Sequence, residues 1–473
     1  MGISVHSSAD TIFAHLWTWI FGDSVVSVRF IPALTGVASI IIIGQIVSEL
    51  GGRTWALILA FTGYLVSPAF LRANALFQPV SFNSLFWLAS TWIMIRLLDT
   101  KNQKWWLVLG VVFGFGFLNK YSIVFPAFSF VIALSLTKER SLFRSRWLVY
   151  GIVAGLIIIL PNFLWQYNHQ WPVVHHMSEL RQTQLIHIRI SGFLLMQVFM
   201  IFPAFLLFLA GLFFVFFDRS AKQFRAMGWA YVTLVLVLIF LSGKFYYSLG
   251  IYPVFFAFGG VAIARYTERT FHWIKYALIV LMVLILLPGL PFSLPLLSFP
   301  NLVRYTQKTS KFGMENLSRW EDGTIHELPQ DYADMTGWME LAEIVRKAWD
   351  SLSPDEQRTT GIFAENYGQA GAIRYYDTKH GLPEPVSFSA SFLLWAPDSV
   401  HTTALIYVNS DTSDISKLFR DVHLVGKIEN RYAREYGVGV YLCRNPVTDF
   451  SAFYANTVAS LKANYSRTSA TAR

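Results

Sequence analysis

The sequence predicts an α-helical protein that crosses a membrane many times and ends in a soluble α/β domain. Of its 473 residues, 54% are hydrophobic and only 14% are charged, whereas ordinary soluble domains carry roughly 25% charged residues. The net charge also differs between the two parts of the chain. Residues 1–300 hold 20 Lys and Arg against 8 Asp and Glu, whereas residues 301–473 hold 18 Lys and Arg against 21 Asp and Glu. A basic surplus on an apolar region is typical of loops at an anionic membrane surface rather than of nucleic-acid binding.

Ten apolar stretches approach the length of about 20 residues that a membrane-spanning helix needs. We expect them in a membrane domain over residues 27–291, at roughly 30–48, 55–71, 80–98, 105–118, 122–137, 147–166, 190–217, 227–242, 247–264 and 272–290. The stretches 105–118 and 122–137 meet at Lys120, and this junction predicts a tight helical hairpin.

The basic residues between these stretches predict the orientation. Fourteen lie in one set of loops, and six lie in the opposite set: Arg29, Arg72, Lys120, Arg181, Arg189 and Lys244. The positive-inside rule places the first set in the cytoplasm. We therefore expect a multi-pass membrane protein, with the loop 167–189 and everything after residue 291 on the outer side.

This orientation also puts the N-terminus outside, although no signal peptide or earlier span would carry it there. Either the chain inserts with its N-terminus outward without a signal, or a span upstream of Met1 is missing from the sequence. In the second case residues 1–26 are the remnant of an outer loop, and Thr11–Gly22 form an amphipathic helix at the membrane interface.

The composition becomes that of a soluble domain after the Pro-rich segment Leu286–Pro300, and we expect an outer α/β domain over residues 301–446. Residues Asp334–Leu352 have helical spacing, and three segments resemble buried strands: Thr359–Ala364, Thr403–Asn409 and Gly437–Arg444. We expect residues 447–473, rich in Ser, Thr and Ala, to be a flexible tail. The single cysteine, Cys443, excludes an intramolecular disulfide.

The expected outer face is rich in cations and aromatic rings. Its candidates are Arg72, Lys120 with Tyr121, Lys244 with Tyr246 and Tyr247, and the segment Trp165–Trp171. A single lysine at a membrane edge has two explanations of about equal frequency: its side chain extends to the lipid headgroups, or it has a function. Two lysine–aromatic sites on one face, together with an arginine, favour an anionic ligand such as a lipid-linked phosphate.

Carboxylates are scarce on that face, where Asp10, Asp23 and Glu179 are the only ones before residue 300. His169, His175 and His176 carry no carboxylate or cysteine spacing that supports a metal site, so we assign no cofactor and leave a divalent metal open. The segment Asn366–Gly371 follows a predicted strand but lacks the G-x-G-x-x-G spacing of a phosphate-binding turn. We interpret it as a closely packed helix start, with Asn366 and Tyr367 as candidates for contact with a ligand.

The chain resembles the membrane glycosyltransferases of family 39, which are related to the protein O-mannosyltransferases and the lipid A aminoarabinose transferases. The resemblance runs from about Phe21 to Arg444 and rests on the order and spacing of several motifs, including FGDSVVSVRFIPALTG, LFQPVSFNSLFWL, FLNKYSIVF, NFLWQYNHQW, GKFYYSLGIYPV and ENYGQAGAIRYY. It implies the C-type membrane glycosyltransferase fold and transfer of a sugar from a polyprenyl phosphate to a glycolipid, such as lipid A, or to a protein. It also implies that Lys120 and Lys244 hold the phosphate of the carrier, within a pocket to which Tyr121, Trp165, His169 and Trp171 contribute.

The sequence departs from the family pattern at its acidic positions. The family's first outer loop carries an Asp-Glu pair, whose aspartate is the expected base, but the matching positions here read Val5-His6-Ser7-Ser8. A second position that is often acidic is Asn83, and an amide cannot take a proton from an acceptor hydroxyl. Asp10 or Asp23 could replace the missing base, although helix capping and loop solvation are the commoner roles for acidic residues in such positions.

Two functions therefore stay open from the sequence. The first is a glycosyltransferase, inactive as given if its base lies upstream of Met1, and the second is a membrane protein that binds the lipid carrier without chemistry. A transporter would normally show inverted repeats and buried mid-membrane charges, and the sequence shows neither.

Overall fold

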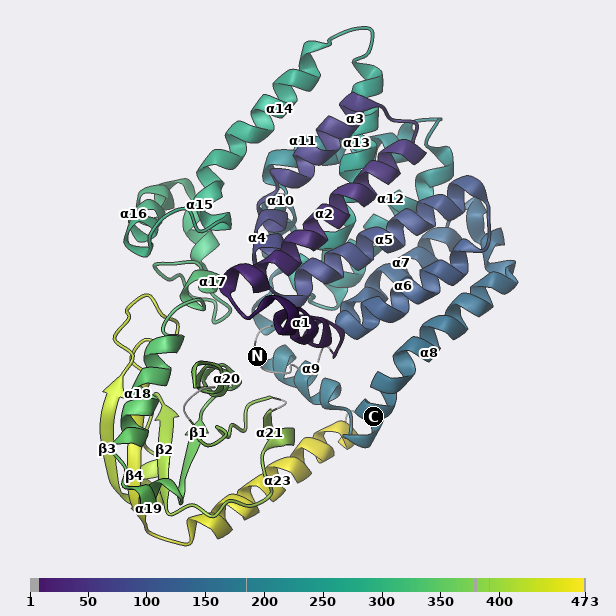
Figure 1. Cartoon of the computed structure of the whole chain (residues 1–473). Coiled ribbons are helices and arrows are strands. Elements are labelled where there is room, and N and C mark those ends of the chain that lie inside the picture. Colours follow the sequence, from purple (N-terminus) through teal and green to yellow (C-terminus); the bar gives the residue numbers. More distant parts are fainter. Residues whose placement is uncertain (1–7, 184, 378–380, 391, 472–473) are drawn as a thin grey trace. The chain divides into compact units, whose positions relative to one another are not determined.

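The computed structural model describes residues 8–183, 185–377, 381–390 and 392–471. The chain divides into two compact units, which are described separately (Figure 1). The membrane unit comprises His6–Trp165 and Gln184–Leu296, and the C-terminal unit comprises Gln166–Thr183 together with Leu297–Arg473.

Almost all of the membrane unit is helical, because its apolar runs offer the backbone no partner other than its own N–H and C=O groups. The helices of this unit are α1 (Ser8–Phe21), α2 (Val25–Glu49), α3 (Thr54–Leu65), α4 (Pro68–Ala75), α5 (Pro79–Thr100), α6 (Trp105–Asn119), α7 (Val124–Ser135), α8 (Arg146–Asn168), α10 (Ile190–Met200), α11 (Phe205–Phe217), α12 (Arg225–Phe240), α13 (Tyr252–Tyr266), α14 (Trp273–Leu286) and α15 (Leu290–Ser293). Short 3₁₀ turns, among them η1 (Tyr121–Ile123) and η6 (Phe245–Ile251), connect some of them.

Five helices among the described residues are long and apolar enough to span a membrane, or up to eight if each bent helix pair is one span. The predicted spans 55–71 and 190–217 are both interrupted, with bends of 67° between α3 and α4 and of 77° between α10 and α11. Proline lies at each restart, as Pro68 of α4 and as Pro203 of the turn before α11. A proline has no N–H to continue the preceding helix and suits the first turn of a new one.

The predicted hairpin at Lys120 is confirmed. Helix α6 ends at Asn119, Lys120 is extended (φ −156°, ψ 126°), and η1 leads into α7, which packs against α6. Helix α13 lies at the centre of the unit, where residues 252–262 are all buried. Its closest neighbour is α11, since a Cβ added at Gly259 would lie 2.0 Å from the carbonyl oxygen of Leu207.

The C-terminal unit is an α/β domain, as the sequence predicts. Its sheet has the strand order β1-β2-β4-β3, and its strands are β1 (Thr360–Ala364), β2 (Ala404–Asn409), β3 (Phe419–Lys427) and β4 (Gly439–Pro446). Strands β1 and β2 are parallel, and β4 pairs antiparallel with both β2 and β3. Helices α18 (Trp338–Asp350) and α20 (Tyr367–Tyr376) contribute Leu341, Val345 and Ile373 to the core that covers the sheet (Figure 1).

The expected tail after residue 446 is instead a helix, α23 (Phe450–Thr471). Phe450, Tyr454 and Val458 are spaced one turn apart and are buried against Leu405, Phe419 and Cys443 of the sheet. The burial of this apolar stripe stabilises the Ser- and Ala-rich segment as a helix, because tertiary packing of one face contributes more to helix stability than composition does.

Candidate functional site

Lys120 and Lys244 reach the same tyrosine ring from different parts of the membrane unit. Lys120 lies between α6 and η1, and Lys244 lies between α12 and η6. The Lys120 Nζ is 4.9 Å from the centre of the Tyr246 ring and 5.2 Å from that of Tyr247, while the Lys244 Nζ is 5.8 Å from the centre of Tyr246. The two ammonium groups are therefore no more than about 11 Å apart.

This arrangement favours an anion. Like charges disfavour one another, and the repulsion grows when they are withdrawn from bulk water. Both lysines are partly buried, and the tyrosine rings stabilise cations through their faces without neutralising the charge. A phosphate group between two ammonium groups would interact favourably with both of them.

Buried hydrogen bonds hold the segment that carries Tyr246 and Tyr247. Gln197 of α10 donates from Nε2 to the carbonyl of Phe245 (3.1 Å), and its Oε1 accepts from the hydroxyls of Ser248 and Tyr252. Gln197 thus fixes the start and middle of η6 and the first residue of α13. Sequence reasoning missed this residue, although a lone glutamine in the apolar run ISGFLLMQVFM was the available signal.

A second polar set holds the segment that follows Lys120. The Tyr121 hydroxyl donates to Asn162 Oδ1 of α8 (3.1 Å), and the Ser122 hydroxyl donates to Asn83 Oδ1 of α5 (3.2 Å). Asn119 donates from Nδ2 to the carbonyl of Pro79, whereas its buried Oδ1 has no partner among the described residues. Asn83 therefore acts here as a buried hydrogen-bond acceptor for the turn after Lys120.

The contacts described for the other predicted residues of the membrane unit involve other partners. Arg72 of α4 donates to the carbonyl of Phe292 in α15 (2.6 Å), and Trp165 is partly buried near the end of α8. Asp23 is exposed directly before Ser24, the residue that caps α2. Asp10 lies in the first turn of α1, and its side chain is outside the described part. Acidic residues at helix starts stabilise the helix dipole, so both positions also have a structural explanation.

Four predicted residues belong to the C-terminal unit. His169 is exposed, and Trp171 follows Gln170 in a turn where both adopt the left-handed backbone (φ 61° and 60°), which is uncommon for residues other than glycine. Asn366 caps α20 by accepting from the Gln369 N–H, and Gln369 accepts from the Asn366 N–H in return. This reciprocal cap agrees with a closely packed helix start. Tyr367, beside the cap, is 51% exposed.

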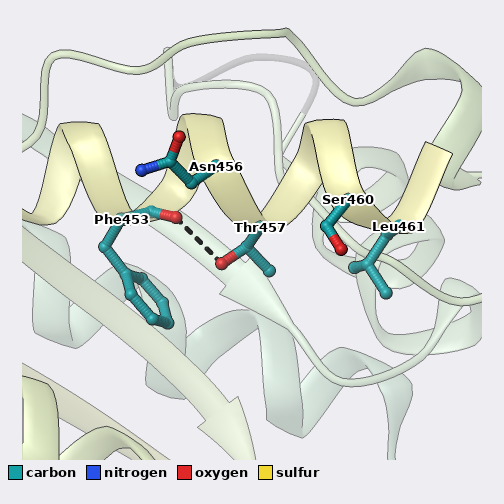
Figure 2. Close-up of a pocket in the computed structure, with 5 residues that line it drawn as sticks. All are labelled: Phe453, Asn456, Thr457, Ser460 and Leu461. Carbon is teal, nitrogen blue, oxygen red and sulfur yellow. Dashed lines mark hydrogen bonds between the residues drawn. The ribbon is translucent and has the colours of Figure 1, made fainter. Parts of the chain in front are cut away.

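No metal site is found among the described residues. No group of three His, Cys, Asp or Glu side chains in that part of the chain could hold a metal ion, and the side chain of His175 lies outside it. One open hollow runs along a single face of α23 (Figure 2), lined by Phe453, Asn456, Thr457, Ser460 and Leu461. It contains no charged group, so it offers nothing to a phosphate.

Comparison with known proteins supports the family resemblance. A family model described as dolichyl-phosphate-mannose-protein mannosyltransferase matches residues 11–165, the part that contains Arg72, Asn83, Lys120 and Tyr121. No curated protein matches the sequence significantly. Among solved structures, the crystal structure of ArnT from Cupriavidus metallidurans in the apo state has a TM-score of 0.58 at 14% sequence identity, covering 91% of this chain and 86% of that chain.

The family model supports a membrane glycosyltransferase that uses a lipid-linked donor, and the likeness to ArnT shows a similar fold. The resemblance to the family 39 membrane glycosyltransferases is thus confirmed, by sequence over residues 11–165 and by a shared helical fold with a small C-terminal sheet over most of the chain.

Proposed function

We propose that this protein transfers a sugar from a polyprenyl phosphate carrier to a hydroxyl of a glycolipid, such as lipid A, or of a protein on the outer side of the bacterial inner membrane. The observation that carries the proposal is the convergence of Lys120 and Lys244 on the ring of Tyr246. Two cations at one aromatic surface suit the phosphate that leaves when the bond to the sugar breaks.

The reaction is a single displacement at the anomeric carbon. The acceptor oxygen attacks and loses its proton, the bond from the carbon to the phosphate oxygen breaks, and the electron pair leaves with the phosphate. Negative charge therefore grows on the phosphate in the transition state, and two fixed ammonium groups stabilise it there. Because attack and departure occur on opposite faces, the configuration at the sugar inverts.

The aromatic residues shape the donor site. Tyr246 and Tyr247 fix the ammonium groups, and the hydrogen bond from Tyr121 to Asn162 holds the chain next to Lys120. Arg72 supplies a third cation for the phosphate, with Asn83 and Trp165 at the donor and His169, Trp171, Asn366 and Tyr367 toward the sugar or acceptor. Asp10 and Asp23 are the proposed proton acceptors.

The proposal is tested by transfer of radiolabel from polyprenyl phosphate sugars into lipid and protein fractions, in membranes that lack related transferases. Lys120→Met and Lys244→Met keep the side-chain length and remove the charge, so each should lower transfer by on the order of 10²-fold. The matched control is Lys104→Met, which removes a lysine that contacts Trp147 at another site of the same unit (5.8 Å) and should leave transfer unchanged.

Three results would decide between the alternatives. Equal loss in all three variants would place the effect in folding or insertion and contradict the donor site. Carrier retention without transfer by the unmodified chain would support the non-catalytic carrier-binding function. If transfer occurs, Asp10→Asn and Asp23→Asn should identify the base, because loss of a base lowers the rate at saturating donor rather than donor affinity.

A further inference from the structure

Helix α16 (Phe299–Thr309) of the C-terminal unit has two chemically different faces. Leu302, Val303 and Thr306 are buried, and the two apolar residues pack in one cluster with Leu328 and Tyr332. The opposite face is exposed and basic, with Arg304 and Lys308 one turn apart and Lys311 three residues further. Lys311 lies in the 3₁₀ turn η8 (Ser310–Phe312) that directly follows α16. The spacing follows the helical repeat, so the cations form one stripe along the helix and this turn.

The charge of this stripe is not compensated locally. Helix α16 contains no acidic residue. In the described part of the chain, no carboxylate lies within ion-pair distance of the three basic side chains, whereas most arginines of the same unit are paired, as Arg431 is with Glu327. A concentrated positive surface of this kind attracts anionic partners.

An exposed aromatic side chain lies beside the basic stripe. Phe312 is 73% exposed, and the Lys311 Nζ lies 5.3 Å from the centre of its ring. Exposed aromatic and aliphatic groups beside lysines and arginines are typical of segments that lie in the headgroup layer of a membrane.

The length of the connecting chain limits the choice of partner. Helix α15 ends at Ser293 and α16 begins at Phe299, so only residues 294–298 separate α16 from the last apolar helices of the membrane unit. Fully extended, such a segment reaches roughly 20 Å. The headgroup layer of the same bilayer lies within that distance of any helix end at the membrane surface.

We propose that the stripe of Arg304, Lys308 and Lys311, together with Phe312, binds the anionic phospholipid surface of the bilayer that contains the protein. The cations would contact phosphate groups, and Phe312 would enter the boundary between headgroups and acyl chains. This contact would tie the start of the C-terminal unit to the membrane. It does not depend on the proposed transferase activity.

The test places a nitroxide at position 312 of the full chain by Phe312→Cys, in bilayer discs that contain phosphatidylglycerol or phosphatidylcholine alone. The native Cys443 does not interfere, because it is buried and burial raises the pKa of its thiol to about 12. Frequent collisions of the nitroxide with oxygen indicate that it lies in the bilayer, and frequent collisions with a water-soluble nickel chelate indicate that it lies in water. Position 424, labelled by Leu424→Cys, is the control, since Leu424 is an exposed apolar residue of β3 (47%).

We expect the label at 312 to favour oxygen over nickel in the anionic discs and the label at 424 to favour nickel. Each basic residue near an anionic surface favours contact about fivefold, so replacing Arg304, Lys308 and Lys311 by Gln should weaken contact by on the order of a hundredfold. Replacing three exposed lysines of the same unit, Lys347, Lys417 and Lys427, by Gln removes the same charge and should change nothing.

Three results would overturn the proposal. The first is nickel access at 312 equal to that at 424 in both kinds of disc. The second is bilayer contact that is the same in phosphatidylcholine and unaffected by the three Gln substitutions. The third is protection of 312 from both reagents, which would indicate a protein partner instead of lipid.

Discussion

The two units of this protein accommodate their positive charges in opposite ways. In the membrane unit most of the described cation contacts are with aromatic rings, such as Lys120 and Lys244 on Tyr246 and Lys275 on Trp55. In the C-terminal unit most are with carboxylates, such as Arg444 with Glu356 and Arg434 with Asp334. The difference follows from composition, since residues 1–300 contain few acids. A ring holds a cation without cancelling its charge, so the membrane unit keeps charge that an anionic ligand can use.

The two units also differ in how glycine serves their packing. In the membrane unit a Cβ at Gly211 would lie 2.1 Å from the carbonyl oxygen of Phe255, and one at Gly259 would lie 2.0 Å from that of Leu207. In the C-terminal unit the glycines that have close neighbours meet side chains, as Gly337 meets Ala433. Small residues that let helix backbones touch are a device of membrane proteins, where apolar lipid provides no hydrophobic drive for helices to associate.

The largest effect is expected from Gly259→Val, which would break the contact between α11 and α13. The added carbons meet a backbone oxygen that cannot move without shifting a helix, so we expect a loss of about 3 kcal/mol or more in the free energy of unfolding. Gly192→Val is the matched control, since Gly192 is also helical but has nothing within 4 Å of an added Cβ. Thermal unfolding in detergent compares the two, and equal midpoints would contradict backbone packing at Gly259.

A second prediction separates the ring of Tyr246 from its hydroxyl. Two cation–ring contacts of about 1 kcal/mol each correspond to roughly a thirtyfold loss of donor affinity in Tyr246→Leu. Tyr246→Phe keeps the ring face and should stay within about threefold of the unmodified chain. The measurement is the donor concentration that gives half-maximal transfer. Equal effects of Leu and Phe would show that the ring does not organise the two lysines.

The smallest effect is expected from an ion pair of the C-terminal unit. The Ser353 N–H, the Ser353 hydroxyl and Arg444 together lower the pKa of Glu356 below its ordinary value. An acid with a lowered pKa in the folded state stabilises the fold above its unfolded pKa, and the stabilisation is lost as the pH falls through the folded pKa. Glu356→Gln should therefore lower the thermal midpoint slightly at pH 7, with the difference vanishing in acid.

The control for this substitution is Glu343→Gln, at an exposed glutamate of α18. It should leave the midpoint unchanged at every pH. A constant difference between Glu356→Gln and the unmodified chain from neutral to acid pH would show that the carboxylate charge is not the cause.

The sequence predicted the elements whose side chains are mostly buried, and it missed those in which buried and exposed positions do not follow a simple apolar pattern. The apolar run that forms β2 was evident, because all but its last residue are buried. Strand β3 was missed, since it is an edge strand whose residues are mostly exposed or only partly buried. The breaks at Pro68 and Pro203 could not be placed, because a proline in an apolar run fits either a kink or a helix start.

In the candidate site, too, some residues could be predicted from the sequence and others could not. Lys120 and Lys244 could be singled out because a charge in an apolar stretch is rare and each is followed within two residues by tyrosine. Their approach to one ring needed the structure, since 124 positions separate them in sequence. Gln197 was missed because its importance rests on two partners in η6 and one at the start of α13, and sequence spacing does not reveal them.

The position of helix α9 (Pro172–Thr183) has a consequence for the order of folding. This helix lies in the chain between α8 and α10 of the membrane unit, yet it is part of the C-terminal unit and packs against α23. Its partner begins at Phe450, 267 residues after Thr183. At roughly 5 to 20 residues per second of synthesis, α9 waits on the order of 15 to 50 s for the helix that it packs against. Helix α9 thus completes its native packing only after α23 has been synthesised.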